Sequence, residues 1–246
     1  MPSLWVMLIV GLLAAVAGYS QGLTGFGFAL VFTPLASLLL PAQEVVLSAL
    51  IVGGIMGILV VLETLRWLPW RRSGPLLLSA AVGAPFGVAV LVVFNAGALR
   101  VLLAITALCM AAAFIIARPA PFRREGVALS VAGALGGFLN GCTSMGGPPA
   151  ALAIANQRWG VIESRGALAM FNLVSFAVGL AAAKLFGILH GGSWLMAVVL
   201  VAPAVVGTVG GALSARRISA IRFRKVLIGA VAVSAVSTLA GALWPR

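Results

Sequence analysis

Two short clusters of glycine and small polar residues interrupt an otherwise apolar chain and repeat one another. Gly22–Gly27 reads GLTGFG, and Gly141–Gly146, 119 positions later, reads GCTSMG. Hydroxyl and amide groups beside the clusters can donate hydrogen bonds to the oxygens of an anion, and glycine lets a ligand approach the backbone closely. Neither cluster contains a carboxylate, the group that a divalent-cation site needs. The clusters therefore predict an anion site rather than a metal site.

A helix broken at each cluster would present its free N–H groups and positive dipole end to a ligand. Two half-helices from opposite halves of the chain could then hold one anion near the membrane midplane. No buried Arg or Lys is expected to hold the anion permanently, which suits a site that must release what it binds. The adjacent Pro148 and Pro149 favour a half-helix start. The candidate substrate-binding residues are Ser20, Gln21, Gly22, Thr24, Gly25, Phe26, Gly27, Asn140, Gly141, Cys142, Thr143, Ser144, Met145, Gly146, Gly147 and Pro148.

The alternative interpretation is that small residues only let helices pack closely. We favour that interpretation for three glycine pairs elsewhere: Gly83/Gly87, Gly133/Gly137 and Gly207/Gly211. Glu44 and Glu163 share the 119-residue separation and could couple transport to protons. Because both fall at predicted membrane edges, we favour a helix N-terminal role for them.

The composition requires lipid around most of these elements. The 246 residues are 63% hydrophobic and only 8% charged, whereas soluble domains carry about 25% charged residues. The net charge of +12 does not indicate nucleic-acid binding, because the arginines form short clusters between apolar runs. The chain has no Asp, a single His and two cysteines without metal-ligand spacing, so we predict no catalytic residue, metal or cofactor.

Six full membrane spans are predicted, near 44–64, 75–94, 99–117, 163–185, 193–214 and 226–244, since about 20 apolar residues cross a bilayer. Two longer segments, Pro2–Leu40 and Gly126–Gln157, contain the glycine clusters. Each is either two spans or a pair of half-helices, and returns the chain to the side it came from. No basic residue precedes the first apolar run, so we interpret it as a retained helix rather than a signal peptide.

Basic residues orient this arrangement. With the loop 66–72 in the cytoplasm, the clusters at 118–124, 158–165 and 216–225 fall on the same side, which places thirteen of the sixteen Lys and Arg inside. Only Arg100, Lys184 and Arg246 remain outside. The prediction is a multi-pass protein of a bacterial inner membrane with both termini periplasmic.

An internal repeat organises the whole chain. The spacing Gly83-x-x-x-Gly87 recurs at Gly207-x-x-x-Gly211, and 99–103 resembles 224–228. Each half contains one broken pair and three spans, an odd number of crossings, so the halves must be inverted. We predict an all-α polytopic membrane protein of two inverted repeats, 1–121 and 122–246, forming one transmembrane domain with eight to ten membrane segments.

The two breaks resemble the signatures of the TauE/SafE sulfite exporter family, which includes proteins like the 4-toluene sulfonate uptake permease. The first runs from Gly18 to Phe28, followed by Pro34-Leu35 and Leu40-Pro41, and the second runs from Gly133 to Pro149. Ser144-Met145 departs from a more glycine-rich family pattern. The resemblance implies transport of sulfur-containing anions such as sulfite, sulfoacetate or taurine derivatives.

We therefore predict a secondary transporter that exports sulfite or organosulfonates by alternating access. The alternative is a proton-coupled uptake permease for sulfonates or other small anions. An intramembrane enzyme would need a nucleophile–base or metal pair, and a non-transporting assembly factor would leave the mirrored breaks unexplained. The expected partners are the small anion, the lipid bilayer and a second copy in a homodimer, but no nucleic acid.

Overall fold

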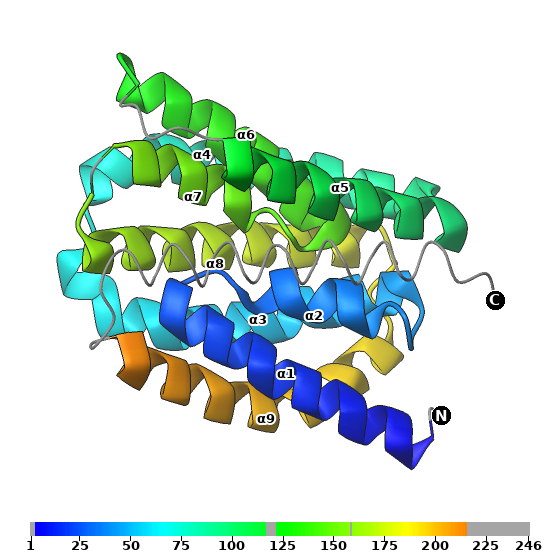
Figure 1. Cartoon of the computed structure of the whole chain (residues 1–246). Helices are drawn as coiled ribbons and strands as arrows, with labels where there is room; N and C mark the ends of the chain where they lie inside the picture. Colours follow the sequence, from blue (N-terminus) through cyan, green and yellow to red (C-terminus); the bar gives the residue numbers. More distant parts are fainter. Residues whose placement is uncertain (1–2, 117–121, 158, 216–246) are drawn as a thin grey trace.

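The computed structural model describes residues 3–116, 122–157 and 159–215, which fold into helices joined by short connections (Figure 1). The helices are α1 (Leu4–Thr24), α2 (Phe28–Ala36), α3 (Ala42–Thr64), the 3-10 turn η1 (Leu65–Trp67), α4 (Trp70–Val93), α5 (Ala96–Ile116), α6 (Glu125–Thr143), α7 (Gly147–Asn156), α8 (Val161–Leu185) and α9 (Gly191–Ala215). The predicted span 226–244 and the basic cluster 216–225 lie outside the described residues.

Within the described ranges, six helices are long and apolar enough to cross a membrane: α1, α3, α4, α6, α8 and α9. Large apolar side chains cover their outward surfaces, including Leu62, Val93 and Leu185, which are 67%, 79% and 86% exposed. Lipid is the solvent that such surfaces require. The protein is therefore a multi-pass α-helical membrane protein, as the composition predicts.

The five predicted spans that fall on described residues coincide with α3, α4, α5, α8 and α9. Each broken segment, which the sequence left as two spans or two half-helices, is one long helix followed by one short one. The long helices α1 and α6 have 21 and 19 residues, and the short helices α2 and α7 have 9 and 10. At 1.5 Å per residue, a 10-residue helix covers only about half of the hydrocarbon core.

The short helices run in opposite directions from the middle of the bundle (Figure 1). The N-terminus and the start of α3 lie at one end of the molecule, whereas the starts of α6 and α8 lie at the other. Each broken segment thus returns the chain to the end from which it entered, as predicted.

Small residues let two pairs of long helices pack with their backbones in contact. A Cβ atom on Gly18 or Gly22 of α1 would collide with backbone carbonyls of α9, and one on Gly207 or Gly211 of α9 would collide with those of α1. The pair α4 and α6 has the same close packing, through Gly83, Gly87, Gly133, Gly137 and Gly141. The packing role predicted for the three glycine pairs is confirmed.

These packing pairs correspond to one another under the predicted repeat, in which α1 matches α6 and α4 matches α9. The first helix of each half packs on the fourth helix of the other half, and α3 packs against α8, its own counterpart. The division into halves and the inverted repeat both stay predictions. The described helices of the two halves form one bundle.

The described basic loops gather at one end of the bundle. Arg72, at the start of α4, binds Glu125, at the start of α6, with a distance of 2.8 Å between Nη2 and Oε1. Trp159, just before α8, donates its indole N–H to the same carboxylate oxygen at 2.8 Å, and Arg72 stacks on its ring. The start of α5, which carries Arg100, and the end of α8, which carries Lys184, lie toward the opposite end (Figure 1). This separation is the one that the charge pattern predicts.

Candidate functional site

The first break, between α1 and α2, forms because Gly25 adopts a left-handed backbone conformation with φ of 89°. Its N–H donates to the Gln21 carbonyl at 2.7 Å and closes the last turn of α1. Glycine tolerates this conformation without a steric penalty. A Cβ at this position would also meet the backbone carbonyl of Arg165 in α8. Gly25 therefore serves both the turn and a close approach of two helices.

The second break uses a serine at the corresponding position. Ser144 has φ of 58°, and its N–H donates to the Asn140 carbonyl at 2.9 Å. Among the described residues it is the only one other than glycine with positive φ. A non-glycine residue in this conformation costs roughly 1–2 kcal/mol. Its hydroxyl lies 2.8 Å from the Thr33 hydroxyl in α2 and donates to the Thr143 carbonyl at 2.6 Å.

Equivalent threonines cap both breaks in the same way. The Thr24 hydroxyl donates to the Ser20 carbonyl at 2.8 Å and accepts from the Phe26 N–H at 3.3 Å. The Thr143 hydroxyl likewise donates to the carbonyl four residues earlier, at 2.7 Å, and accepts from the Met145 N–H at 3.2 Å. The two clusters thus share hydrogen bonds as well as sequence.

An amide side chain occupies the start of each short helix. Gln21 Oε1 accepts from the Phe28 N–H, the first of α2, at 3.0 Å. Asn140 Oδ1 accepts from the Gly146 N–H, directly before α7, at 2.6 Å. These oxygens lie where the oxygens of an anion bound at a helix N-terminus would lie. In this conformation, the protein's own amides satisfy donors that a ligand could use.

Asn140 is further held by α8. Its Nδ2 donates to Asn172 Oδ1 at 3.0 Å and to the Ser175 hydroxyl at 2.7 Å. All three side chains are at most 1% exposed. Such a buried network costs several kcal/mol if a partner is removed, so it fixes the Asn140 amide toward the second break. The sequence analysis identified Asn140 but missed Asn172 and Ser175, since single polar residues inside an apolar helix carry no spacing signal.

The two breaks meet in the centre of the protein. Besides the contact between Thr33 and Ser144, the Phe26 ring packs so closely on Gly147 that a Cβ there would overlap it. Gly147 is the only one of the first three residues of α7 with an N–H, because Pro148 and Pro149 have none. The structure therefore brings the starts of both short helices together, with Thr33 as a contact that the sequence analysis missed.

Every predicted binding residue of both clusters is buried. Four of their glycines pack against protein atoms: Gly22 on Thr208, Gly141 on Ala84, Gly27 on Ser20 and Gly146 on Gly136. Cys142 and Met145 are likewise inside the bundle, at 0% and 1% exposure. The Ser20 hydroxyl is buried and has no hydrogen-bond partner among the described residues. It is an unused donor directly beside the first break.

Glu44 and Glu163 lie outside the two glycine clusters. Each occupies the first turn of its helix, α3 and α8 respectively. Glu163 Oε2 accepts from the Gly160 N–H at 3.1 Å, which satisfies a free donor at the helix start. Negative charge at this position also complements the helix dipole. The geometry agrees with the favoured helix N-terminal role.

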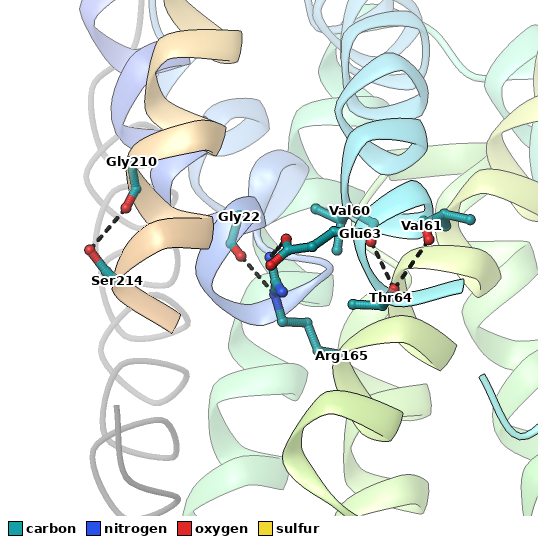
Figure 2. Close-up of polar contacts among 8 residues, drawn as sticks. All are labelled: Gly22, Val60, Val61, Glu63, Thr64, Arg165, Gly210 and Ser214. Carbon is teal, nitrogen blue, oxygen red and sulfur yellow. Dashed lines mark hydrogen bonds and ion pairs between the residues drawn. The ribbon is translucent and has the colours of Figure 1, made fainter. Parts of the chain in front are cut away.

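Arg165 differs from the expectation. The sequence assigned it to a basic loop and predicted no buried cation near the site, but it lies inside α8 and is 4% exposed. Its Nε donates to the Gly22 carbonyl at 2.8 Å, and its Nη2 binds Glu63 Oε2 at 2.8 Å (Figure 2). The guanidinium stays buried because a carboxylate and a helix C-terminus offset its desolvation. Neither partner is near it in sequence, so no local pattern announces the contact.

The fold and these breaks define a class of protein, a helical membrane protein whose discontinuous helices meet at its centre. Discontinuous helices of this kind form the binding sites of secondary transporters. The chain belongs to the sulfite exporter TauE/SafE family, whose profile matches residues 10–238. The protein is therefore a membrane transporter of a family that carries sulfite and related sulfur anions. None of the curated proteins and none of the solved structures compared with the chain matched it.

Proposed function

We propose that the protein exports sulfite or organosulfonates by alternating access, with the anion bound between the starts of α2 and α7. The observation that carries the proposal is the meeting of the two breaks, in which Thr33 of α2 touches Ser144 of the second break at 2.8 Å. Phe26, two residues before α2, also packs on Gly147 at the start of α7, so the breaks bring the beginnings of both short helices and several hydroxyl groups together, and neither glycine cluster contains a carboxylate. Such a site suits an anion, because helix dipoles and N–H groups stabilise negative charge.

In the proposed mechanism, the anion takes the place of the amide oxygens. Gln21 Oε1 and Asn140 Oδ1 release the N–H groups at the helix starts, and the buried Ser20 hydroxyl turns toward the ligand. Exchanging one set of acceptors for another keeps every donor satisfied, which limits the cost of binding and of release. In this mechanism, the buried side chains of the clusters belong to a state that is closed to both ends of the bundle.

Membrane potential supplies the driving force for export of a monoanion. Moving one charge through the full potential is worth about 2.3 kcal/mol per 100 mV, or roughly a fifty-fold gradient. Proteoliposomes loaded with sulfite should therefore lose it faster when a potassium gradient makes the interior negative. Efflux that does not respond to potential would contradict an exporter of this kind.

The alternative, proton-coupled uptake, makes a different prediction in the same vesicles. An imposed pH gradient would drive sulfonate accumulation, and Glu44→Gln or Glu163→Gln would abolish it. Both carboxylates lie in the first turns of helices rather than at the breaks, which favours export without them.

Substrate choice is tested by binding. We expect one or more of sulfite, thiosulfate, sulfoacetate and taurine to raise the melting temperature of the purified wild type, with sulfate as a comparison anion. The effect should weaken in Thr143→Ala, whose missing hydroxyl leaves the Met145 N–H unpaired. If none of these ligands shifts the wild type, the anion site is contradicted. We also propose that the protein lies in a bacterial inner membrane with both termini in the periplasm and that it forms a homodimer.

A further inference from the structure

An ion pair beside the first break connects three helices that are far apart in sequence (Figure 2). Arg165 of α8 binds Glu63, near the end of α3, at 2.8 Å between Nη2 and Oε2. Their side chains are 5% and 24% exposed, so water screens the pair only weakly. The same guanidinium holds the Gly22 carbonyl at the end of α1.

Arg165 touches the first break at two positions. Its Nε binds the last turn of α1 through Gly22, and its own backbone carbonyl fills the space where a side chain on Gly25 would stand. A buried guanidinium at the edge of an anion site offers five N–H donors in a planar fork, which matches the oxygens of a sulfonate as it matches a carboxylate. Two of these donors make the bonds described above.

A cavity of about 260 Å³ lies against the carboxylate partner of this pair. It lies between the packed helices α3 and α9, is open on its outer side, and is lined by Leu59, Val60, Glu63, Thr208, Val209, Ala212 and Leu213. A water molecule occupies roughly 30 Å³ of liquid, so the cavity can hold a small oxyanion with part of its hydration shell. Thr208 also packs directly on Gly22, which places the cavity beside the carbonyl that Arg165 binds.

An incoming anion at this cavity meets a carboxylate that is bound to the guanidinium it would need. Among the described residues that line the cavity, Glu63 is the one with a charge, and its carboxylate occupies the guanidinium that would attract an anion. Exchange removes the conflict, because a sulfonate or sulfite that replaces the carboxylate meets the same fork of donors. Glu63 is in the last turn of α3 and Arg165 is near the start of α8, so the pair lies on the side of the first break that faces the basic loops, from which an exported anion would enter.

We propose that Arg165 is a substrate-binding residue of the transporter and that Glu63 is its internal competitor, which holds the guanidinium until the anion displaces it. This inference rests on the proposed function, since it assigns an entry site to the exported anion. In such a competition, the apparent affinity for the anion equals its intrinsic affinity multiplied by the fraction of time that the guanidinium is free. Weakening the competitor must therefore tighten anion binding, an effect that a purely structural ion pair would not produce.

The test is the concentration dependence of sulfite transport by the full-length protein in proteoliposomes. Glu63→Gln removes the competing charge but keeps an acceptor for the guanidinium, and should lower KM about five- to ten-fold. Arg165→Lys keeps the charge but loses the fork, and should raise KM at least about ten-fold. Glu63→Asp, which keeps the charge on a shorter side chain, should lower KM by a smaller factor and stands in if Glu63→Gln does not fold.

Glu125→Gln is the matched control. It removes one negative charge from an Arg–Glu pair at the same end of the bundle, so it reports any general effect of surface charge on local anion concentration. Its KM should equal that of the wild type. An unchanged or raised KM in both Glu63 variants, with an active wild type, overturns this inference and leaves the proposed function standing. A wild type that moves neither sulfite nor an organosulfonate overturns both.

Discussion

Ser144 allows the contact between the two breaks to be tested with a pair of substitutions at one position. Ser144→Ala removes the hydroxyl but keeps a Cβ at φ of 58°, whereas Ser144→Gly removes both. The lost hydrogen bond to Thr33 is worth about 1 kcal/mol, and a buried hydroxyl left without a partner costs about 1–3 kcal/mol. Relief of the backbone strain in the glycine variant returns about 1 kcal/mol.

We therefore expect Ser144→Ala to lose about 1–3 kcal/mol of stability and Ser144→Gly to be about 1 kcal/mol more stable than Ser144→Ala. The measurement is thermal or denaturant unfolding of the purified protein in one detergent, compared at matched concentration. Thr33→Val completes a double-mutant cycle with Ser144→Gly. The double variant should lose about 1 kcal/mol less stability than the sum of the losses in the two single variants. Additive losses, or an alanine variant as stable as the glycine variant, would refute the reasoning.

Two further predictions concern packing and the helix N-terminus. Gly137→Val should abolish accumulation of folded protein, because the valine side chain would overlap the backbone carbonyl of Ala80 in α4. Gly126→Val, on the same helix but with open space around it, should accumulate normally, and equal yields would contradict the packing argument. Glu163→Gln should lose only about 0.5 kcal/mol of stability through the weaker dipole interaction while it keeps an acceptor for the Gly160 N–H. Its efflux should match the wild type, and complete loss of transport would instead indicate coupling.

Much of this protein follows from its sequence because the controlling physics is local or compositional. A chain with 8% charged residues cannot cover itself for water, and the arginine clusters mark one end of the bundle. The breaks are also locally encoded. Gly25 accepts positive φ, and Pro148 and Pro149 lack the N–H groups that would continue a helix. Both effects act within a few residues, so both breaks appear in the sequence at the positions where the structure has them.

Tertiary structure alone decided which groups meet. A row of glycines on a helix indicates that the backbone of another helix can pack closely there. Which helix packs there, α9 in the case of α1, depends on the shape of the whole interface. Thr33 reaches Ser144 across 111 residues, and Arg165 reaches Glu63 across 102. Arg165 resembles its neighbours in the basic loops by type and position. What separates it from them is burial against a carboxylate and a helix end, a balance of desolvation and pairing that exists only once α1, α3 and α8 are packed.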